Sequence, residues 1–231
     1  TRYIGDWSSD VCSSDLQRIL CKNGEGRRVG QLAIFIRLQK CNLNCSYCDT
    51  RWANGDDAPY TLMSEDEIYD RILKSGIKNI TLTGGEPLLH KDVEILLEKI
   101  GNNPNLSLEI ETNGSIELEK FSKLKNPPLF TMDYKLPSSK MENKMCLDNF
   151  KYLTSKDTVK FVVGTIEDLK KAKEIIERYF LIGKCAVYFS PVFNSINPVE
   201  IVEFMKKNRL NGVNLQLQIH KFIWDPESKG V

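Results

Sequence analysis

The 231-residue sequence has little excess charge and no long apolar run. Lysine and arginine number 32 against 31 aspartates and glutamates, for a net charge of +1. The charges are spread evenly, so there is no electrostatic case for nucleic acid. No stretch approaches the roughly 18 apolar residues of a membrane span, and no secretory signal is recognisable. We therefore expect a cytoplasmic protein with neither a nucleic-acid nor a membrane partner.

The cysteines lack the even number and the spread of a disulfide framework. There are seven, and three of them, Cys41, Cys45 and Cys48, fall within eight residues. Cys146 and Cys185 are isolated in apolar surroundings, where we expect buried thiols acting as small hydrophobic side chains. In a reducing cytosol, clustered thiols serve metals or chemistry. The cluster is therefore the first candidate site.

The first residues lack the periodicity of the rest. The segment "DWSSDVCSSDL" (6–16) has no helical or strand repeat, and it resembles the in-frame translation of a sequencing-library adapter. We therefore predict that residues 1–17 are a sequence artefact or a disordered tail. No internal repeat or low-complexity linker divides the remainder, so residues 18–231 are predicted to form a single domain.

From residue 30 onwards, apolar β-branched runs alternate with amphipathic segments of helical period. The predicted strands are 32–38, 79–83, 106–112, 129–135, 158–164, 186–192 and 213–220. The predicted helices start at Ser64, whose spacing to Glu67 forms a capping box, and follow near 89–100, 116–124, 143–153, 165–180 and 198–208, the last capped by Asn197. Strict alternation specifies a parallel sheet with right-handed crossovers. An open doubly wound sheet and a full or partial barrel both satisfy it.

Polar or glycine-rich segments follow four of these strands. They are Cys41 to Thr50, Gly84 to Pro87, Thr112 to Gly114, and the pair Asp133 and Lys135. In both architectures ligands bind at the carboxyl ends of parallel strands. These segments are therefore the candidate site.

Three thiols in one loop favour an iron–sulfur cluster over zinc. Structural zinc is bound by four protein ligands. Neither Cys21 nor His90 has the sequence spacing expected of a fourth ligand. A [4Fe–4S] cluster takes one thiolate per iron, so three cysteines leave one iron open to a substrate-like ligand. A zinc-binding module and three buried core thiols are the weaker alternatives.

The C-x3-C-x2-C spacing after the first strand resembles the radical S-adenosylmethionine (SAM) superfamily. "TGGEP" (83–87) resembles its second motif, which contacts the amino group of SAM. The resemblance implies that the open iron chelates SAM and that reductive cleavage yields a 5′-deoxyadenosyl radical. It also implies that Glu86 meets an ammonium group and that the glycines let the backbone approach the ligand.

Residues 19–231 resemble one family of this superfamily, the 7-carboxy-7-deazaguanine synthases. The resemblance is carried by "NGEG" (23–26), "FIR" (35–37), Cys48-Asp49-Thr50 with Trp52 and Ala53, "ETNG" (111–114), "PSS" (137–139) and the tail 217–231. The chain departs from the family at Asn23, where Gln is usual, and at Asp133-Tyr134, where Ser-Pro is common.

The resemblance implies a partial, trimmed β/α barrel with a mostly parallel sheet of about six or seven strands. It implies a lyase of queuosine-precursor biosynthesis that converts 6-carboxytetrahydropterin to 7-carboxy-7-deazaguanine with loss of ammonia. The implied cofactors are a [4Fe–4S] cluster, SAM and Mg²⁺. The implied partners are a flavodoxin- or ferredoxin-type electron donor and a second copy of the chain. A glycyl-radical-enzyme activase is the main alternative within the superfamily.

The resemblance also assigns residues to each ligand. The cluster ligands are Cys41, Cys45 and Cys48, and Thr50 offers its hydroxyl oxygen to Mg²⁺. The residues assigned to SAM are Tyr47, Asp49, Gly84, Gly85, Glu86, Thr112, Asn113, Asp133, Lys135 and Ser190. The residues assigned to the substrate are Asn23, Gly24, Glu25, Arg37, Thr83, His220 and Val231. The structural alternatives are an Arg37–Glu86 ion pair, a structural His220 and a frayed end at Val231.

Overall fold

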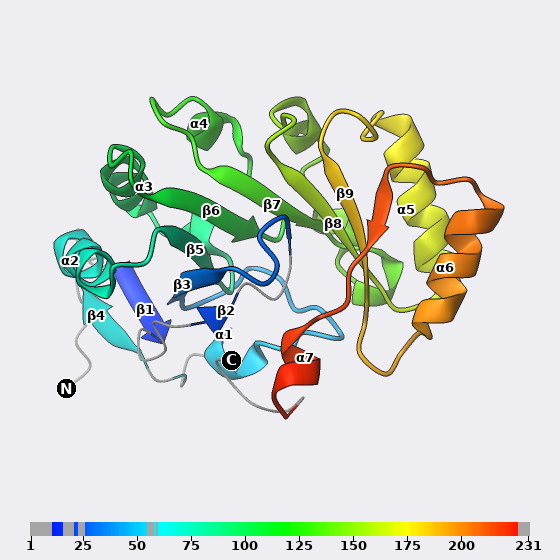
Figure 1. The fold of residues 1–231 in the computed structure, drawn as a ribbon, viewed down its shortest axis with the longest axis horizontal. Coiled ribbons are helices and arrows are strands. Elements are labelled where there is room, and N and C mark those ends of the chain that lie inside the picture. Colours follow the sequence, from blue (N-terminus) through cyan, green and yellow to red (C-terminus); the bar gives the residue numbers. More distant parts are fainter. Residues whose placement is uncertain (1–10, 16–20, 23–25, 55–57, 59, 226–231) are drawn as a thin grey trace.

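The computed structural model describes residues 11–15, 21–22, 26–54, 58 and 60–225. A parallel sheet forms its centre (Figure 1). Its seven strands are β3 (Leu32–Leu38), β5 (Asn79–Gly84), β6 (Ser107–Thr112), β7 (Leu129–Tyr134), β8 (Thr158–Val163), β9 (Ala186–Pro191) and β10 (Val213–Leu215).

In space these strands keep their order along the chain, from β3 at one end to β10 at the other. A doubly wound sheet would reverse its strand order at a switch point, so that alternative is wrong for this chain. Among the described residues β10 pairs with β9 alone, so the sheet does not close. The fold is therefore the predicted α/β arrangement, a partial barrel with a mostly parallel sheet.

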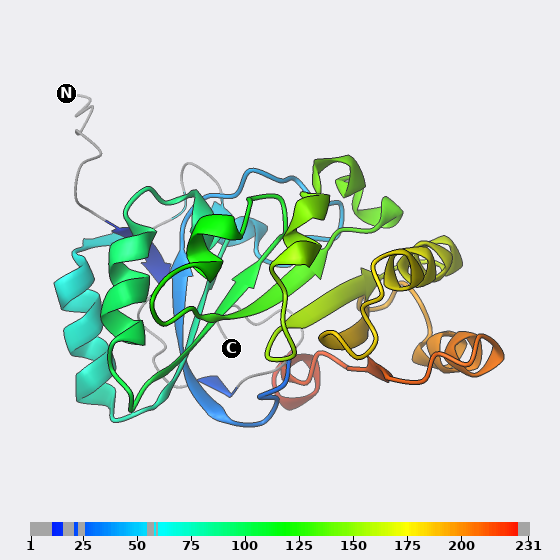
Figure 2. The same ribbon diagram turned by 90° about the horizontal axis from the view of Figure 1, so that it is seen from above.

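Helices surround the outside of this sheet (Figures 1 and 2). They are α2 (Glu65–Ser75), α3 (Val93–Gly101), α4 (Glu119–Ser122), α5 (Ile166–Arg178) and α6 (Pro198–Lys207). The views place α2 and α3 at one end of the sheet and α5 and α6 at the other. The capping box predicted from Ser64 to Glu67 is present at the start of α2, and boxes of the same kind start α5 and α6. In the part of the chain that the structure describes, no helix is long and apolar enough to cross a membrane.

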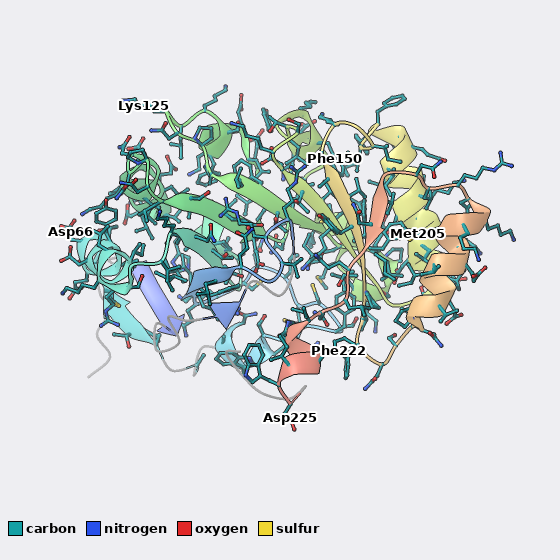
Figure 3. The ribbon with its side chains drawn as sticks, viewed as in Figure 1. Asp66, Lys125, Phe150, Met205, Phe222 and Asp225 are labelled. Atoms are coloured by element: carbon teal, nitrogen blue, oxygen red, sulfur yellow. The ribbon has the colours of Figure 1, made fainter. Side chains whose placement is uncertain are left out.

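The helix predicted near 143–153 is wrong. This segment forms two 3-10 turns, η3 (Glu142–Lys144) and η4 (Leu147–Lys151). The buried Asn149 side chain accepts from Leu118 N at 2.9 Å and donates to Gly114 O at 3.1 Å. Phe150 of η4, labelled in Figure 3, stacks on Tyr179. The two ring centroids lie 4.3 Å apart. These tertiary contacts hold the segment in short turns, which its local pattern did not reveal.

Additional strands extend the edge of the sheet beyond β3. β1 (Val11–Asp15) pairs antiparallel with β3 and with β4 (Thr61–Met63), and β2 (Cys21–Lys22) also pairs with β3. No strand pattern was recognised over 6–16, so β1 corrects that interpretation. Strand pairing uses backbone groups, which any sequence without proline can offer to an open edge. The foreign origin of residues 1–17 and the single domain over 18–231 stay predictions.

The last predicted strand is also shorter than expected. β10 ends at Leu215, and Gln216 N makes one more sheet bond, to Phe189 O at 2.8 Å. The chain then turns into α7 (His220–Ile223), which carries an exposed Phe222 (Figure 3). His220 therefore begins a short helix and does not end a strand.

Candidate active site

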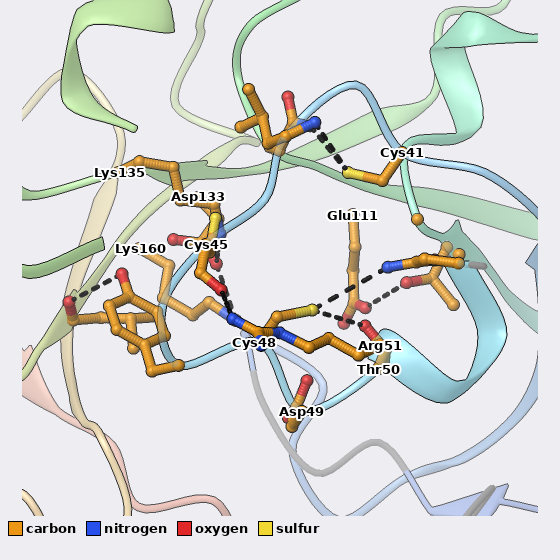
Figure 4. A pocket seen from close by; sticks show the side chains of 18 of the residues that line it. Cys41, Cys45, Cys48, Asp49, Thr50, Arg51, Glu111, Asp133, Lys135 and Lys160 are labelled. Atoms are coloured by element: carbon orange, nitrogen blue, oxygen red, sulfur yellow. Dashed lines mark hydrogen bonds and ion pairs between the residues drawn. The ribbon is translucent and has the colours of Figure 1, made fainter. Parts of the chain in front are cut away.

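A cavity of about 580 Å³ opens inside the curve of the sheet (Figure 4). Alternate residues near the carboxyl ends of several strands line it, including Thr131 and Asp133 on β7 and Lys160 and Val162 on β8. The intervening residues, such as Met132 and Phe161, are buried in the core. Because strand side chains alternate between the two faces, one face of each strand builds the core and the other builds the cavity wall.

The cysteine loop, residues 41–50, starts where the ends of β3 and β5 meet. Gly85 N donates to Leu38 O at 3.1 Å, and the next residue's N–H bonds to Lys40 O at 2.9 Å. A Cβ on Gly84 would lie 2.1 Å from Leu38 O, and one on Gly85 would lie 2.0 Å from Lys40 O. Both glycines line the cavity, but their lack of a side chain is required by this backbone contact. The expected approach of a ligand to these glycines stays a prediction.

The middle of the loop is held by the "PSS" segment, which forms the 3-10 turn η2 (Pro137–Ser139). Ser46 N donates to Ser139 O at 3.1 Å, and Ser46 Oγ donates to Ser138 O at 2.6 Å. Arg51, in the short helix α1 (Arg51–Asn54), donates from Nη2 to Cys45 O at 2.7 Å. The distant η2 turn and the neighbouring helix α1 therefore fix the backbone at Cys45 and Ser46.

The chemistry of the three thiols suits a metal cluster. Cys41, Cys45 and Cys48 all line the cavity. Cys41 Sγ accepts from Leu43 N at 3.4 Å and from Asn113 Nδ2 at 3.6 Å. N–H donors around sulfur stabilise thiolates and tune cluster potentials. Burial raises the pKa of the Cys41 and Cys45 thiols, so a bound cation is needed to hold them ionised at neutral pH.

The polar neighbours of Cys48 are Thr50, just before helix α1, and Asn54, the last residue of that helix. Thr50 Oγ1 lies 3.5 Å from Cys48 Sγ, and Asn54 Nδ2 lies 3.9 Å from the same sulfur. No three His, Cys, Asp or Glu side chains within the described ranges are grouped to hold one metal ion. A cluster binds one thiolate at each of its irons and not all at one centre, so the residues present fit a [4Fe–4S] group.

An aspartate between two lysines forms the neighbouring part of the wall (Figure 4). Asp133 Oδ2 lies 2.9 Å from Lys135 Nζ and 3.7 Å from Lys160 Nζ. Burial alone would lower the pKa of Lys135, but the Asp133 carboxylate raises it above its ordinary value. Among the described residues, the buried Asp133 Oδ1 has no hydrogen-bond partner. A buried acceptor without a partner is unfavourable, so this part of the wall suits a ligand that brings a hydrogen-bond donor.

The expected substrate residues Arg37 and Thr83 lie on the two strands nearest the loop. Arg37 Nη1 donates to Gly84 O at 3.3 Å, and its guanidinium carbon lies 5.9 Å from the Trp52 ring centroid. Thr83 Oγ1 donates to Glu111 Oε2 at 2.8 Å. His220 of α7 reaches the same cavity. Residues from both ends of the chain therefore meet at one site.

Most residues expected at the site share this cavity. Those that line it are Cys41, Cys45, Tyr47, Cys48, Asp49, Thr50, Arg37, Thr83, Gly84, Gly85, Thr112, Asn113, Asp133, Lys135 and His220. Glu86 and Ser190 do not line it. The remaining four, Asn23, Gly24, Glu25 and Val231, lie outside the described residues.

Glu86 is a fully buried structural carboxylate. It accepts from Asn113 N at 2.6 Å, from Leu88 N at 3.0 Å and from Thr112 Oγ1 at 3.0 Å. These donors occupy the oxygens that were expected to meet an ammonium group. Ser190 is buried too, and its Oγ has no hydrogen-bond partner among the described residues. Neither side chain lines the cavity, and their assignment to SAM stays a prediction.

Several residues that line the cavity were not predicted from the sequence. The charged or amide-bearing ones are Arg51, Asn54, Glu111, Lys160, Gln218 and Lys221. A signal existed for Lys160, because a charged residue inside the apolar run "TVKFVVG" must face a polar interior or carry a partner. Glu111 is the first residue of the "ETNG" segment, and its position in that motif was the available signal.

Comparisons with known proteins agree with this geometry. Residues 35–173 match the Radical SAM superfamily. The chain is 55% identical to the 7-carboxy-7-deazaguanine synthase of Clostridium acetobutylicum over 94% of this chain and 98% of that protein. The protein of the same name from Chlorobaculum tepidum is 34% identical, over 90% and 92%. The crystal structure of QueE from Escherichia coli shares the fold, with a TM-score of 0.70 and 19% identity over 90% and 93% of the two chains. The chain therefore belongs to the 7-carboxy-7-deazaguanine synthase family of the radical SAM superfamily.

Proposed function

We propose that this chain is a 7-carboxy-7-deazaguanine synthase, a lyase that converts 6-carboxytetrahydropterin to 7-carboxy-7-deazaguanine with loss of ammonia. The supporting observation is that one cavity combines three cysteine thiols with charged groups suited to SAM and to a carboxylate substrate. Family membership favours this activity over a glycyl-radical-enzyme activase and over a zinc-binding module. The product would serve queuosine or another deazapurine.

Cys41, Cys45 and Cys48 would hold the [4Fe–4S] cluster, with SAM beside it. When bound, the cluster and SAM supply an electron and a 5′-deoxyadenosyl radical that removes a hydrogen atom from the substrate. Asp133 Oδ1, without a hydrogen-bond partner among the described residues, would accept from the SAM amino group. Lys135 and Lys160 balance the aspartate charge in a place where water is scarce. Thr50 would offer its hydroxyl oxygen to Mg²⁺.

The substrate end of the cavity supplies a cation and several acceptors. Arg37 suits the substrate carboxylate, because its planar guanidinium binds carboxylates with two parallel hydrogen bonds. Glu111, near Thr83, offers acceptor oxygens to the N–H groups of the pterin. The remaining assigned contacts, from Asn23, Gly24, Glu25, His220 and Val231, rest on the family resemblance.

The cluster chemistry calls for an electron donor, and the family resemblance suggests its type and a homodimer. A one-electron reductant of flavodoxin or ferredoxin type would reduce the cluster, and two copies of the chain would form a homodimer in the cytoplasm.

Anaerobic reconstitution with iron and sulfide, followed by SAM, a reductant, Mg²⁺ and 6-carboxytetrahydropterin, tests the proposal. We expect 7-carboxy-7-deazaguanine and ammonia in equal amounts, detected by mass spectrometry and an ammonia assay. Cys45→Ala should bind less iron and form neither product nor 5′-deoxyadenosine, whereas Cys146→Ala, outside the cavity lining, should behave as the unmodified chain. SAM cleavage that proceeds without deazapurine formation would argue for a different substrate.

A further inference from the structure

Two threonine–glutamate hydrogen bonds link β6 to its two neighbouring strands, on the face of the sheet that is turned toward the cavity. Thr83 on β5 donates to Glu111 at 2.8 Å, and Thr131 Oγ1 on β7 donates to Glu109 Oε1 at 2.5 Å. Glu109 and Glu111 are two residues apart, so their side chains share one face of the strand. Thr131 lines the cavity, whereas Glu109 is buried and does not line it.

The carboxylates decide how the threonine hydroxyls face a ligand. A hydroxyl has one proton and two lone pairs, and it normally rotates to act as donor or acceptor. A carboxylate oxygen only accepts, so Thr131 must direct its proton to Glu109. Only the lone pairs of Thr131 Oγ1 are then able to interact with a ligand in the cavity, and they can only accept a hydrogen bond. Glu109 thereby turns an adaptable group into a hydrogen-bond acceptor.

Gly26 and Gln216 pack against the Thr131–Glu109 pair. Gly26 N donates to Gln216 Oε1 at 2.6 Å, and Gln216 Nε2 donates to Gly26 O at 3.0 Å, across 190 residues of sequence. A Cβ on Gly26 would lie 3.2 Å from Glu109 Oε1 and 3.7 Å from Thr131 Oγ1. The Gly26 backbone therefore packs directly on the pair, and the Gln216 carboxamide satisfies both of its peptide groups. Away from water, the Thr131–Glu109 hydrogen bond is stronger than it would be at the surface.

We propose that Thr131, held as an acceptor by Glu109, is a specificity-determining residue that receives an N–H donor of the substrate. The inference rests on the proposed function, since a pterin presents a guanidine-like row of N–H groups. Thr83 and Thr131 flank β6, so a ligand edge rich in donors matches both acceptors. A ligand with an acceptor atom next to Thr131 Oγ1 would be repelled by the hydroxyl lone pairs, so binding of such a ligand is disfavoured.

The test compares KM values for 6-carboxytetrahydropterin and for SAM in the reconstituted enzyme. Thr131→Val should raise the pterin KM about 2- to 12-fold, the effect of losing one neutral hydrogen bond, and leave the SAM KM unchanged. Thr131→Ser, which keeps the hydroxyl, should restore the pterin KM. Thr158→Val is the matched control, because Thr158 is buried, pairs in register with Thr131 and does not line the cavity. It should leave both KM values unchanged.

Glu109→Gln is the second variant, in case the valine variant does not fold. Its carboxamide can donate to Thr131 and release the hydroxyl proton, so the pterin KM should rise in the same direction. A pterin KM equal to that of the unmodified enzyme in a folded Thr131→Val or Glu109→Gln variant would overturn the inference. So would an equal rise in both KM values with a lower Tm, which marks a structural role. If the unmodified enzyme does not convert the pterin at all, the proposed function fails instead, and the inference fails with it.

Discussion

The Glu86 carboxylate accepts a 2.6 Å hydrogen bond from the backbone N–H of Asn113 and so joins the ends of β5 and β6 behind the cavity. Burial raises the pKa of Glu86 from 4.5 to about 7, against the hydrogen bonds from Asn113, Leu88 and Thr112, which lower it. The carboxyl group therefore titrates near neutral pH inside the folded chain. This gives the protein a stability that depends on pH.

A raised carboxyl pKa means that the folded state holds its proton more tightly than the unfolded state. The resulting stabilisation is complete below about pH 4.5 and is lost as the pH rises through about 7. We expect the free energy of unfolding to fall by on the order of 3 kcal/mol from about pH 5 to about pH 8. Denaturant titrations across this range should show a flatter profile for Glu86→Gln. Glu67→Gln, in the exposed capping box of α2, should keep the slope of the unmodified chain, and an equal slope in Glu86→Gln would contradict this.

Asp133→Asn should destabilise the fold strongly. The substitution leaves Lys135 and Lys160, whose side chains are only 12% and 13% exposed, beside a neutral group. Removing one partner of a buried pair costs about 3–5 kcal/mol. Because all three side chains keep some contact with solvent, we expect a loss near the lower end. Asp148→Asn is the control, since its ion pair with Lys151 is well exposed and is worth at most about 1 kcal/mol. Urea denaturation measures both, and similar losses would show that the Asp133 cluster is solvated.

Asp168 anchors the "PSS" turn that holds the cysteine loop. Its carboxylate accepts from Ser138 N at 2.9 Å, Gly164 N at 2.8 Å and Thr165 N at 3.1 Å, and from the Ser138 hydroxyl. Asp168→Ala should cost about 3 kcal/mol, since several buried donors lose their acceptor. It should also lower the iron bound after reconstitution.

Glu200→Ala offers a matched control for Asp168. Glu200 holds the same capping-box position in α6 but is exposed and bonds within its own cap. Its loss should cost about 1 kcal/mol and leave iron binding unchanged. Equal iron content in the two variants would mean that the "PSS" turn does not depend on Asp168.

Thr50→Val should remove the stimulation by Mg²⁺ and lower activity roughly tenfold or more, because a hard oxygen donor is lost. The hydroxyl also lies 3.5 Å from Cys48 Sγ, so Thr50→Ser, which keeps the oxygen, is the necessary control. Assays with Mg²⁺ and with a chelator separate the two roles. A valine variant that still responds to Mg²⁺ would exclude Thr50 as the ligand.

The sequence by itself determined the order of the seven parallel strands and the chemistry of the loop. Apolar strands bounded by capped helices identify the parallel sheet, because both signals are local: the alternation of side chains and the hydrogen bonds of a helix start. The spacing of Cys41, Cys45 and Cys48 identifies a three-thiolate site for the same reason, since all three lie in one loop.

Only the tertiary structure decided which polar groups face the cavity. Glu86 and Glu111 both lie in motif segments, yet Glu86 is enclosed by Asn113, Leu88 and Thr112 while Glu111 reaches the cavity. The segment over 143–153 became two turns because Asn149 bonds to Gly114 and Leu118. The pairing of Gly26 with Gln216 joins residues 190 positions apart. Such contacts depend on how several strands curve together, and the periodicity of any single strand shows which residues share a face but not what that face meets.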